Sequence, residues 1–515
     1  MTRYFSSFIF GLSALLLTVS CSKDLGNYDY HDINELAITG VESTYSVLTG
    51  VDTLHIEPEI AATEADQPDE RYDYFWILRG SNQFVDTVGT ERALDYPIDL
   101  APETFTLHFR TVDKQTGVAW WTNSDLVVGT PYSRGLLLIG ENEQGQAEAE
   151  MISMVSDTLH IPNILSNSGL PALTDPVGFL HTGGYYVKMW VLTRSGSYYL
   201  DRMTMKSTPA NQFGSLVYTT DPIQTETLDP IVIAPQIGSE AGATGQTWIR
   251  AVLCSDGSVF VSYTLLNGGD FYPNPMNRTS DDPDRLLKAA PYLLYSIGSL
   301  NAVMWYDSEN ERFMNISNIG LSTSSTVLTD GASDPFPWNQ AAAGRILVYA
   351  ENTRNTDGGS VNGNSFAITK DGNNRHYIYK FYANGANPAK HAAYTVLPMA
   401  TDFDKADFYA FSSNRTVVFY SVGNKLYAYD YNPGNERIYP YPTIGTDEIT
   451  MLKFDTQIDH LTNSLYIATY GAGTKGTLRR FIVGSNPNVV ELTPAENGEW
   501  NNLINVTNMS WRAAN

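Results

Sequence analysis

One strand–turn–strand motif occurs twice in the chain and limits the folds that are open to it. The apolar segment 301–307 ends in an aromatic residue and Asp307, and after a short turn a second strand begins with Glu, Arg and an apolar residue. Segment 424–430 repeats this pattern and ends at Asp430, so the two aspartates lie 123 residues apart, which is three intervals of 41. Blades of β-propellers recur about every 40–50 residues. The spacing therefore predicts a propeller.

Weaker copies of the motif occur elsewhere between residues 130 and 515. They lie at 189–200, 252–261, 366–379 and 465–483, and a first apolar strand lies at 136–139. These segments predict a roughly seven-bladed propeller in 386 residues, with long insertions at 266–288, 329–343 and 352–364. A closed ring leaves only short, protected sheet edges, and the last strand near 505–511 would complete the sheet begun at 136–139. Two or three stacked β-sandwiches are the alternative.

The segment before this block has the length and pattern of one β-sandwich. Residues 72–78 alternate around Trp76, and residues 105–110 form a second alternating strand. A turn then leads to a return strand that begins with Trp120 and Trp121, which must point to opposite faces. We expect an immunoglobulin-like sandwich over residues 35–129 with Trp76 in its core.

The first 21 residues have the features of a lipoprotein signal. Arg3 is followed by an apolar run at 5–19, which is too short to span a membrane comfortably, and a small residue precedes Cys21. We expect a signal peptide over residues 1–20, acylation (palmitate or a similar chain) of Cys21 and a lipidated tether over 21–34. Several acyl chains hold a protein stably on a membrane. An ordinary secretory signal with a chance cysteine is the alternative.

The start of the mature chain resembles a known family. The lipobox, residues 23–30 and residues 33–35 are similar to the start of PKD-like lipoproteins of Bacteroidota. Residues 22–24 also resemble a surface-export signal, with a plain flexible tether as the alternative. The resemblance implies a PKD-like sandwich followed by a longer β-rich region. It also implies a cell-surface, outer-membrane accessory role beside a SusC-like transporter and a SusD-like lipoprotein, in which the protein captures a glycan or peptide nutrient.

Composition excludes several classes of protein. The chain has 32 Lys and Arg against 56 Asp and Glu, a formal charge of −24, which argues against a nucleic-acid partner. Its 12% aromatic and 17% charged residues are not those of a disordered chain. Two cysteines exclude a disulfide scaffold and a cysteine-based zinc site, and we expect Cys254 to be an inert core residue.

Sequence motifs for catalysis and metal binding are scarce. The chain has no Gly-x-Ser-x-Gly elbow, no His-Glu-x-x-His and no P-loop, and its eight histidines lack metal-ligand spacing. We expect no cofactor. The acidic turns at 281–284 and 357–364 could take Ca²⁺, but solvated turns are the favoured interpretation. An enzyme would need two suitably placed carboxylates, or histidines that converge in the funnel of a polysaccharide lyase, for which the candidates are His181, His376 and His460.

Binding is the favoured function, and aromatic residues in loops are its candidates. Sugar rings stack on flat aromatic faces, and peptides use similar clefts or exposed strand edges. The candidate ligand-binding residues are Phe271, Tyr272, Phe336, Trp338, Tyr185 and Tyr186. The leading hypothesis is a non-catalytic surface protein that binds a nutrient polymer or docks on a transporter. A surface glycoside hydrolase or polysaccharide lyase, and a structural or adhesive protein, remain alternatives.

Overall fold

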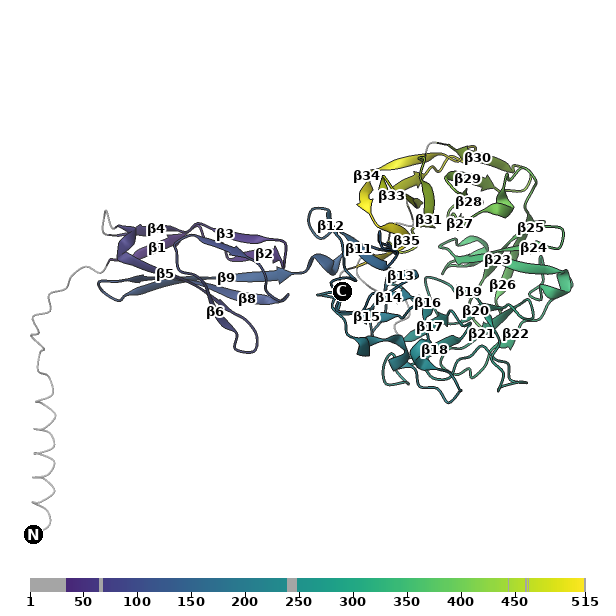
Figure 1. Cartoon of the computed structure of the whole chain (residues 1–515), viewed down its shortest axis with the longest axis horizontal. Coiled ribbons are helices and arrows are strands. Elements are labelled where there is room, and N and C mark those ends of the chain that lie inside the picture. The colour runs from purple at the N-terminus through teal and green to yellow at the C-terminus, as the bar shows by residue number, and fades with distance from the viewer. Residues whose placement is uncertain are drawn as a thin grey trace, which may run out of the picture. The chain divides into compact units, whose positions relative to one another are not determined.

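The computed structural model describes residues 34–63, 68–238, 248–442, 444–458, 461 and 463–513. These residues form β-strands joined by loops and short 3-10 turns, with no α-helix among them (Figure 1). None of the described helical turns is long or apolar enough to cross a membrane. The predicted signal peptide, Cys21 and His460 lie outside the described residues. The chain divides into two compact units, Met1–Val128 and Gly129–Asn515.

The first unit is a β-sandwich. Its larger sheet has the order β2-β9-β8-β5-β6, and the ladders β1-β4 and β3-β7 contribute the remaining strands. The strands are β1 (Leu36–Thr39), β2 (Thr44–Leu48), β3 (Thr53–Ile56), β4 (Glu59–Ala62), β5 (Tyr72–Arg79), β6 (Val85–Gly89), β7 (Leu94–Pro97), β8 (Thr104–Asp113) and β9 (Ala119–Gly129). Trp76 is fully buried against Phe109, 4.3 Å between ring centroids, as predicted. Trp120 packs against the same core, whereas Trp121 is 61% exposed.

The second unit contains seven sheets among its described residues. The first sheet has the order β12-β11-β10-β35 and consists of β10 (Gly135–Glu141), β11 (Ala147–Ser153), β12 (Leu159–Ile161) and β35 (Asn505–Arg512). The second sheet consists of β13 (Pro176–His181), β14 (Met189–Thr193) and β15 (Tyr198–Leu200). The third consists of β16 (Pro230–Ala234), β17 (Ile249–Cys254) and β18 (Val259–Tyr263).

The other four sheets have four strands each, in chain order. They are β19 (Ala289–Leu294), β20 (Val303–Asp307), β21 (Arg312–Ile316) and β22 (Thr326–Val327); β23 (Arg345–Asn352), β24 (Ser365–Asp371), β25 (His376–Tyr382) and β26 (Ala389–Thr395); β27 (Phe408–Phe411), β28 (Val417–Val422), β29 (Lys425–Asp430) and β30 (Arg437–Tyr441); β31 (Glu448–Phe454), β32 (Ser464–Gly471), β33 (Lys475–Val483) and β34 (Leu492–Leu503).

The seven sheets form a ring, as the repeat spacing predicts (Figure 1). One strand of each sheet lies towards the centre, and each of these strands contacts the next in the series β35, β13, β16, β19, β23, β27 and β31, while β31 also contacts β35. The C-terminal strand β35 pairs with β10, so the end of the chain completes its first sheet. This is the architecture of a seven-bladed propeller.

The repeated aspartates stabilise equivalent turns. Oδ1 of Asp307 accepts hydrogen bonds from the backbone N–H groups of Glu309 and Asn310, at 3.1 and 3.2 Å, in the turn from β20 to β21. Oδ1 of Asp430 accepts a 3.0 Å bond from the N–H of Asn432 between β29 and β30. Both aspartates are buried, so the motif that indicated the repeat has a structural role in each copy.

The junction between β10 and β35 leaves no room for a side chain at Gly140. A methyl group at this position would overlap the backbone carbonyl of Asn505 on the facing strand. Gly140→Ala should therefore force the ladder apart and lower the stability of the second unit by about 1–3 kcal/mol, the usual cost of overpacking. Thermal unfolding measures this effect. Gly372→Ala is the matched control, because nothing lies within 4 Å of a methyl group there; equal stability of the two variants would contradict the closure described above.

Candidate functional site

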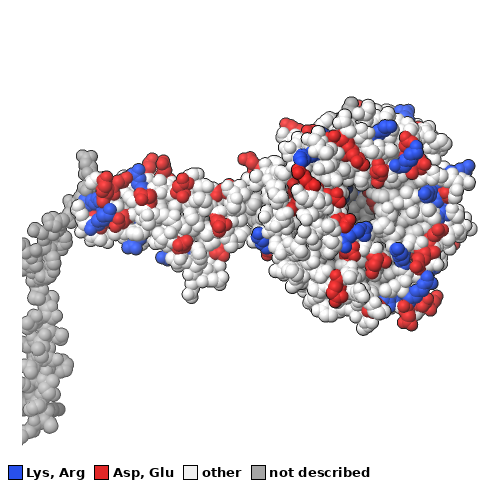
Figure 2. Space-filling view, in the orientation of Figure 1, with Lys and Arg blue, Asp and Glu red and all other residues white. Residues whose placement is uncertain are grey.

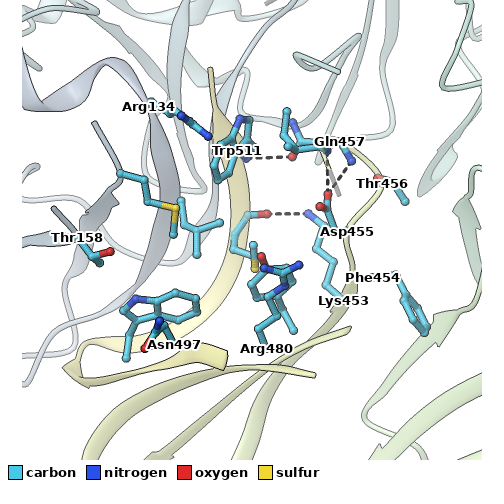
Figure 3. A pocket seen from close by; sticks show the side chains of 16 residues that line it. Arg134, Thr158, Lys453, Phe454, Asp455, Thr456, Gln457, Arg480, Asn497 and Trp511 are labelled. Carbon is cyan, nitrogen blue, oxygen red and sulfur yellow. Dashed lines mark hydrogen bonds between the residues drawn. The ribbon is translucent and has the colours of Figure 1, made fainter. Parts of the chain in front are cut away.

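Two adjoining cavities lie in the second unit. The central cavity, of about 410 Å³, is lined by inner strands and by residues that directly follow them, among them Ile237 after β16, Tyr295 after β19 and Arg354 after β23. Figure 2 shows a hollow at the centre of the ring with acidic and basic side chains around it. The second cavity, of about 450 Å³, lies where the last sheet meets the first (Figure 3). Lys453, Phe454, Thr456 and Gln457 line both cavities.

The second cavity combines flat aromatic surfaces with cationic groups. Trp500 is half-buried and Trp511 mostly buried, while Arg134 and Arg480 supply guanidinium groups. Nε of Arg480 donates to Oγ of Ser464 at 3.0 Å, which positions this side chain. Mostly apolar walls with a few placed polar groups are typical of ligand pockets, and both volumes are in the range of about 300–1,000 Å³ that such pockets occupy.

The wall between the two cavities is held by its own hydrogen bonds. Oδ1 of Asp455 accepts from the N–H groups of Gln457 and Ile458 at 2.8 and 3.1 Å (Figure 3). The side chain of Gln457 donates to the carbonyl of Ile237 at 2.8 Å and accepts from the N–H of Trp511 at 3.0 Å. These bonds connect β31, β16 and β35 and give the wall one conformation.

Lys453 extends from β31 to the wall. Its Nζ donates to Oδ1 of Asn508 at 3.2 Å and to the carbonyl of Met509 at 2.7 Å, both on β35. Burial lowers the pKa of Lys453 to about 8, because removal from water penalises the ammonium, and Asp455 and Glu351 offset only part of this effect.

Glu351 lies in the central cavity at the end of β23. Its carboxylate accepts a hydrogen bond from the hydroxyl of Tyr349 at 2.9 Å and another from the backbone N–H of Phe411. Burial raises the pKa of Glu351 to about 7, although both hydrogen bonds and Lys453 favour the ionised form. Carboxyl groups with such shifted pKa values in cavities are candidates for functional sites.

Arg354 reaches across the end of β27. Its backbone N–H donates to Oγ of Ser413 at 3.0 Å, and its Nε donates to the carbonyl of Thr456 at 2.7 Å. Burial lowers the pKa of Arg354, and Tyr295 and Asp455 act in the opposite direction. The guanidinium group is therefore fixed at the central cavity beside the shared wall.

Three of the six aromatic residues that the sequence suggested are core residues. Phe336 and Trp338 are 2% and 3% exposed. Phe336 stacks on Tyr379 at 4.2 Å, and Nζ of Lys390 lies over both rings of the pair Phe336 and Trp338. Tyr272 is fully buried and donates its hydroxyl hydrogen bond to Asp270 at 2.8 Å. These loops fold back onto the sheets, so the three rings pack inside instead of facing a ligand.

The other three aromatic candidates are accessible, but they lie outside the two cavities. Phe271 is half-buried and packs edge-to-face on the exposed Tyr218, and an open groove of about 390 Å³ lies beside this pair. Tyr185 and Tyr186 are 59% and 41% exposed, and Tyr185 stacks on Trp248 with ring centroids 4.0 Å apart. Of these three residues, Phe271 alone lines the groove.

The histidines do not converge where the structure describes them. His181 is fully buried beside Arg512, and burial together with that guanidinium lowers its pKa to about 2. His376 is buried and packs against Phe403. Neither of the two lines a described cavity. Within the described ranges, no group of three or more His, Cys, Asp or Glu side chains is arranged to hold a metal ion.

The residues that line the two cavities were missed in the sequence. Glu351 and Lys453 had one usable signal, because each is a charged residue near the end of a largely apolar strand. Trp500 and Arg480 carry no comparable pattern. They come together with Arg134 only because the last sheet packs beside the first.

Comparison with known proteins adds a family for the N-terminal part of the chain. Residues 21–169 match the PKD-like family. The match extends beyond the sandwich and includes β10, β11 and β12 of the second unit. No curated protein sequence matches the chain.

Several solved structures resemble the fold. A quinoprotein alcohol dehydrogenase-like protein from Bacteroides thetaiotaomicron is 12% identical, with a TM-score of 0.40, and the match covers 93% of this chain and 99% of that one. The extracellular domain of a putative one-component system of the same organism is 9% identical, with a TM-score of 0.34 and coverage of 87% and 55%. A protein of the Bacteroides ovatus mixed-linkage glucan utilisation locus, solved with a mixed-linkage heptasaccharide, is 10% identical, with a TM-score of 0.15 and coverage of 63% and 74%. Similarity at this level concerns the fold alone.

The shifted pKa of Glu351 predicts how stability depends on pH. Between pH 4.5 and about 7 the native protein retains a proton on Glu351 that the unfolded chain has released, so the free energy of unfolding decreases as pH rises through this window. Glu351→Gln should remove this contribution, which is at most about 3.5 kcal/mol at about 1.4 kcal/mol per pKa unit. Urea unfolding at pH 5 and pH 7.5 measures it. Glu309→Gln, outside the cavities, should retain the full pH dependence; the same slope in both variants would contradict the assignment.

Proposed function

We propose that this chain is a non-catalytic binding protein whose ligand is a segment of a nutrient polymer, held in the cavity between the last and first sheets. The observation that carries the proposal is the composition of this cavity. The half-buried indole of Trp500 and the ring of Tyr466 lie in the same walls as Arg134 and Arg480. Apolar ring faces combined with directional donors match the alternating apolar and hydroxyl surfaces of a sugar.

The site is suited to binding because its walls are already formed. The hydrogen bonds of Asp455 and Gln457 hold the shared wall through partners within the chain. A preformed wall reduces the ordering entropy that binding would otherwise cost. We favour a glycan over a peptide, because the flat faces of Trp500 and Tyr466 suit the apolar faces of sugar rings.

The cellular setting is a second part of the proposal. The lipobox predicts acylation of Cys21, and residues 21–169 match the PKD-like family. Together they support a lipid-anchored protein at the outer membrane, exposed at the cell surface, that passes its ligand to a SusC/SusD-type uptake complex. Affinity purification from detergent-solubilised outer membrane, followed by mass spectrometry, tests the last step; recovery of the protein alone would contradict it.

Cys21→Ser should release the protein from the membrane. The substitution removes the thiol to which the acyl chains are attached, so the protein should move to the soluble fraction and lose incorporation of labelled palmitate. Cys254→Ser is the control, because Cys254 is buried in the second unit and should leave the anchor intact. A Cys21→Ser protein that remains in the membrane fraction and still incorporates label would argue against lipidation at this position.

An enzyme is the second candidate function, and Glu351 is the observation in its favour. A carboxyl group with a pKa near 7 can donate a proton to a leaving group at neutral pH. Turnover of polysaccharides by the purified protein, abolished in Glu351→Gln, would support a hydrolase or lyase. Binding of a polysaccharide without turnover would contradict the enzyme and support the binding function.

Trp500→Ala should weaken ligand binding by at least about tenfold, which corresponds to about 1.4 kcal/mol. The substitution removes the accessible apolar face of the cavity. Affinity electrophoresis against a panel of neutral and acidic polysaccharides identifies a ligand, and isothermal titration calorimetry then measures its Kd. Trp121→Ala is the matched control, because Trp121 is an exposed indole of the other unit. Equal affinities for both variants, each with an unchanged unfolding temperature, would refute this site.

A further inference from the structure

The two adjoining cavities have the opposite charge balance to the whole chain. The chain carries 32 basic and 56 acidic residues. The described lining of the two cavities contains four basic side chains, Arg134, Arg354, Lys453 and Arg480, and two acidic ones, Glu351 and Asp455. An excess of cations inside an acidic protein attracts an anionic ligand to this position.

Arg354 presents unused donors. Its Nε is bonded to the carbonyl of Thr456, but no acceptor within the described chain takes a hydrogen bond from either Nη. The planar guanidinium fork matches the two oxygens of a carboxylate. Since the Nε bond already fixes the group, little side-chain entropy remains to be lost when an anion binds.

Lys453 also has an N–H donor that no described residue accepts. An ammonium group has three N–H donors, and the described residues accept two hydrogen bonds from it, at Asn508 and Met509. Both acceptors are neutral. The lowered pKa of Lys453 shows that its charge is poorly compensated, so an anionic group beside it would be stabilising.

Two carboxyl groups, Glu351 and Asp455, lie in the same lining as these cations. Oδ1 of Asp455 accepts hydrogen bonds from two backbone N–H groups of the wall. Both oxygens of Glu351 accept hydrogen bonds, and its pKa of about 7 leaves it partly protonated near neutral pH. The lining of the two cavities thus contains more basic than acidic side chains.

We propose that Arg354 and Lys453 form a carboxylate subsite that binds the acidic group of a uronic-acid residue in a glycan. The inference rests on the proposed function and names its ligand class. The rings of Tyr292, Tyr295 and Tyr349 line the same cavity as Arg354 and Lys453, so aromatic surfaces lie in the cavity that contains the subsite. The aromatic wall favours a sugar chain over an acidic peptide.

Calorimetry with matched probes tests the subsite. The probes are oligomers of galacturonate, mannuronate and hyaluronan, neutral galacto-oligosaccharides of equal length and a polyglutamate peptide. We expect at least one uronate oligomer to bind at least about tenfold more tightly than its neutral counterpart, and this preference to decrease with ionic strength. Arg354→Gln should remove the preference, so that acidic and neutral oligomers of equal length bind with similar affinity. Arg285→Gln is the matched control, because Arg285 pairs with Glu309 on the surface and lines neither cavity.

Each outcome separates the subsite from the general function. Neutral oligomers that bind as tightly as acidic ones, with Trp500-dependent affinity, would overturn the subsite and leave the binding function intact. Binding of polyglutamate through Arg354, with no binding of the uronates, would overturn the assignment to uronic acid. Failure of every glycan would overturn both proposals. If Arg354→Gln lowers the unfolding temperature, Lys453→Gln provides the same comparison.

Discussion

The pairing of β35 with β10 is the constraint on which the second unit depends. It joins strands separated by more than 360 residues, and it places the last sheet beside the first. The cavity with Trp500 and Arg480 exists only at this junction, since its walls come from β10 and β35 of the first sheet and from β31, β32, β33 and β34 of the last. Gly140 allows the two strands to approach closely enough to pair. Closure of the ring and formation of the site are therefore one structural event.

Burial of the charged groups at the centre of the ring costs folding free energy. Glu351, Arg354 and Lys453 have pKa values shifted by burial in the direction that disfavours their charged forms. Apolar side chains of similar size would pack at these positions of the inner strands at a lower cost in folding free energy. Each charge is instead held by hydrogen bonds to neighbouring strands, which fixes its position. Such placement is expected of groups that are maintained for a ligand, and it is the physical basis of the carboxylate subsite.

Most of the fold could be predicted, and little of the site. The spacing of Asp307 and Asp430 predicted the repeat because each aspartate stabilises its own turn through local hydrogen bonds. The alternation of residues around Trp76 predicted the sandwich, because alternation is also a property of a few neighbouring residues in one strand. The burial of Phe336 and Trp338 was not predicted. Residue type and loop context do not show whether a loop folds back onto its sheet. The two rings bury themselves against Tyr379 and Lys390, which come from later strands.

The sequence by itself determined the β architecture, the division into a sandwich and a repeat unit, and the acidic surface, since strand alternation, turn chemistry and charge act over a few residues or over the whole chain. Only the tertiary structure decided which residues meet. Arg354 and Lys453 are 99 positions apart, and Trp500 and Arg134 are 366 apart. They line neighbouring cavities because the ring closes, and no local pattern encodes a contact that depends on seven sheets packing in a circle.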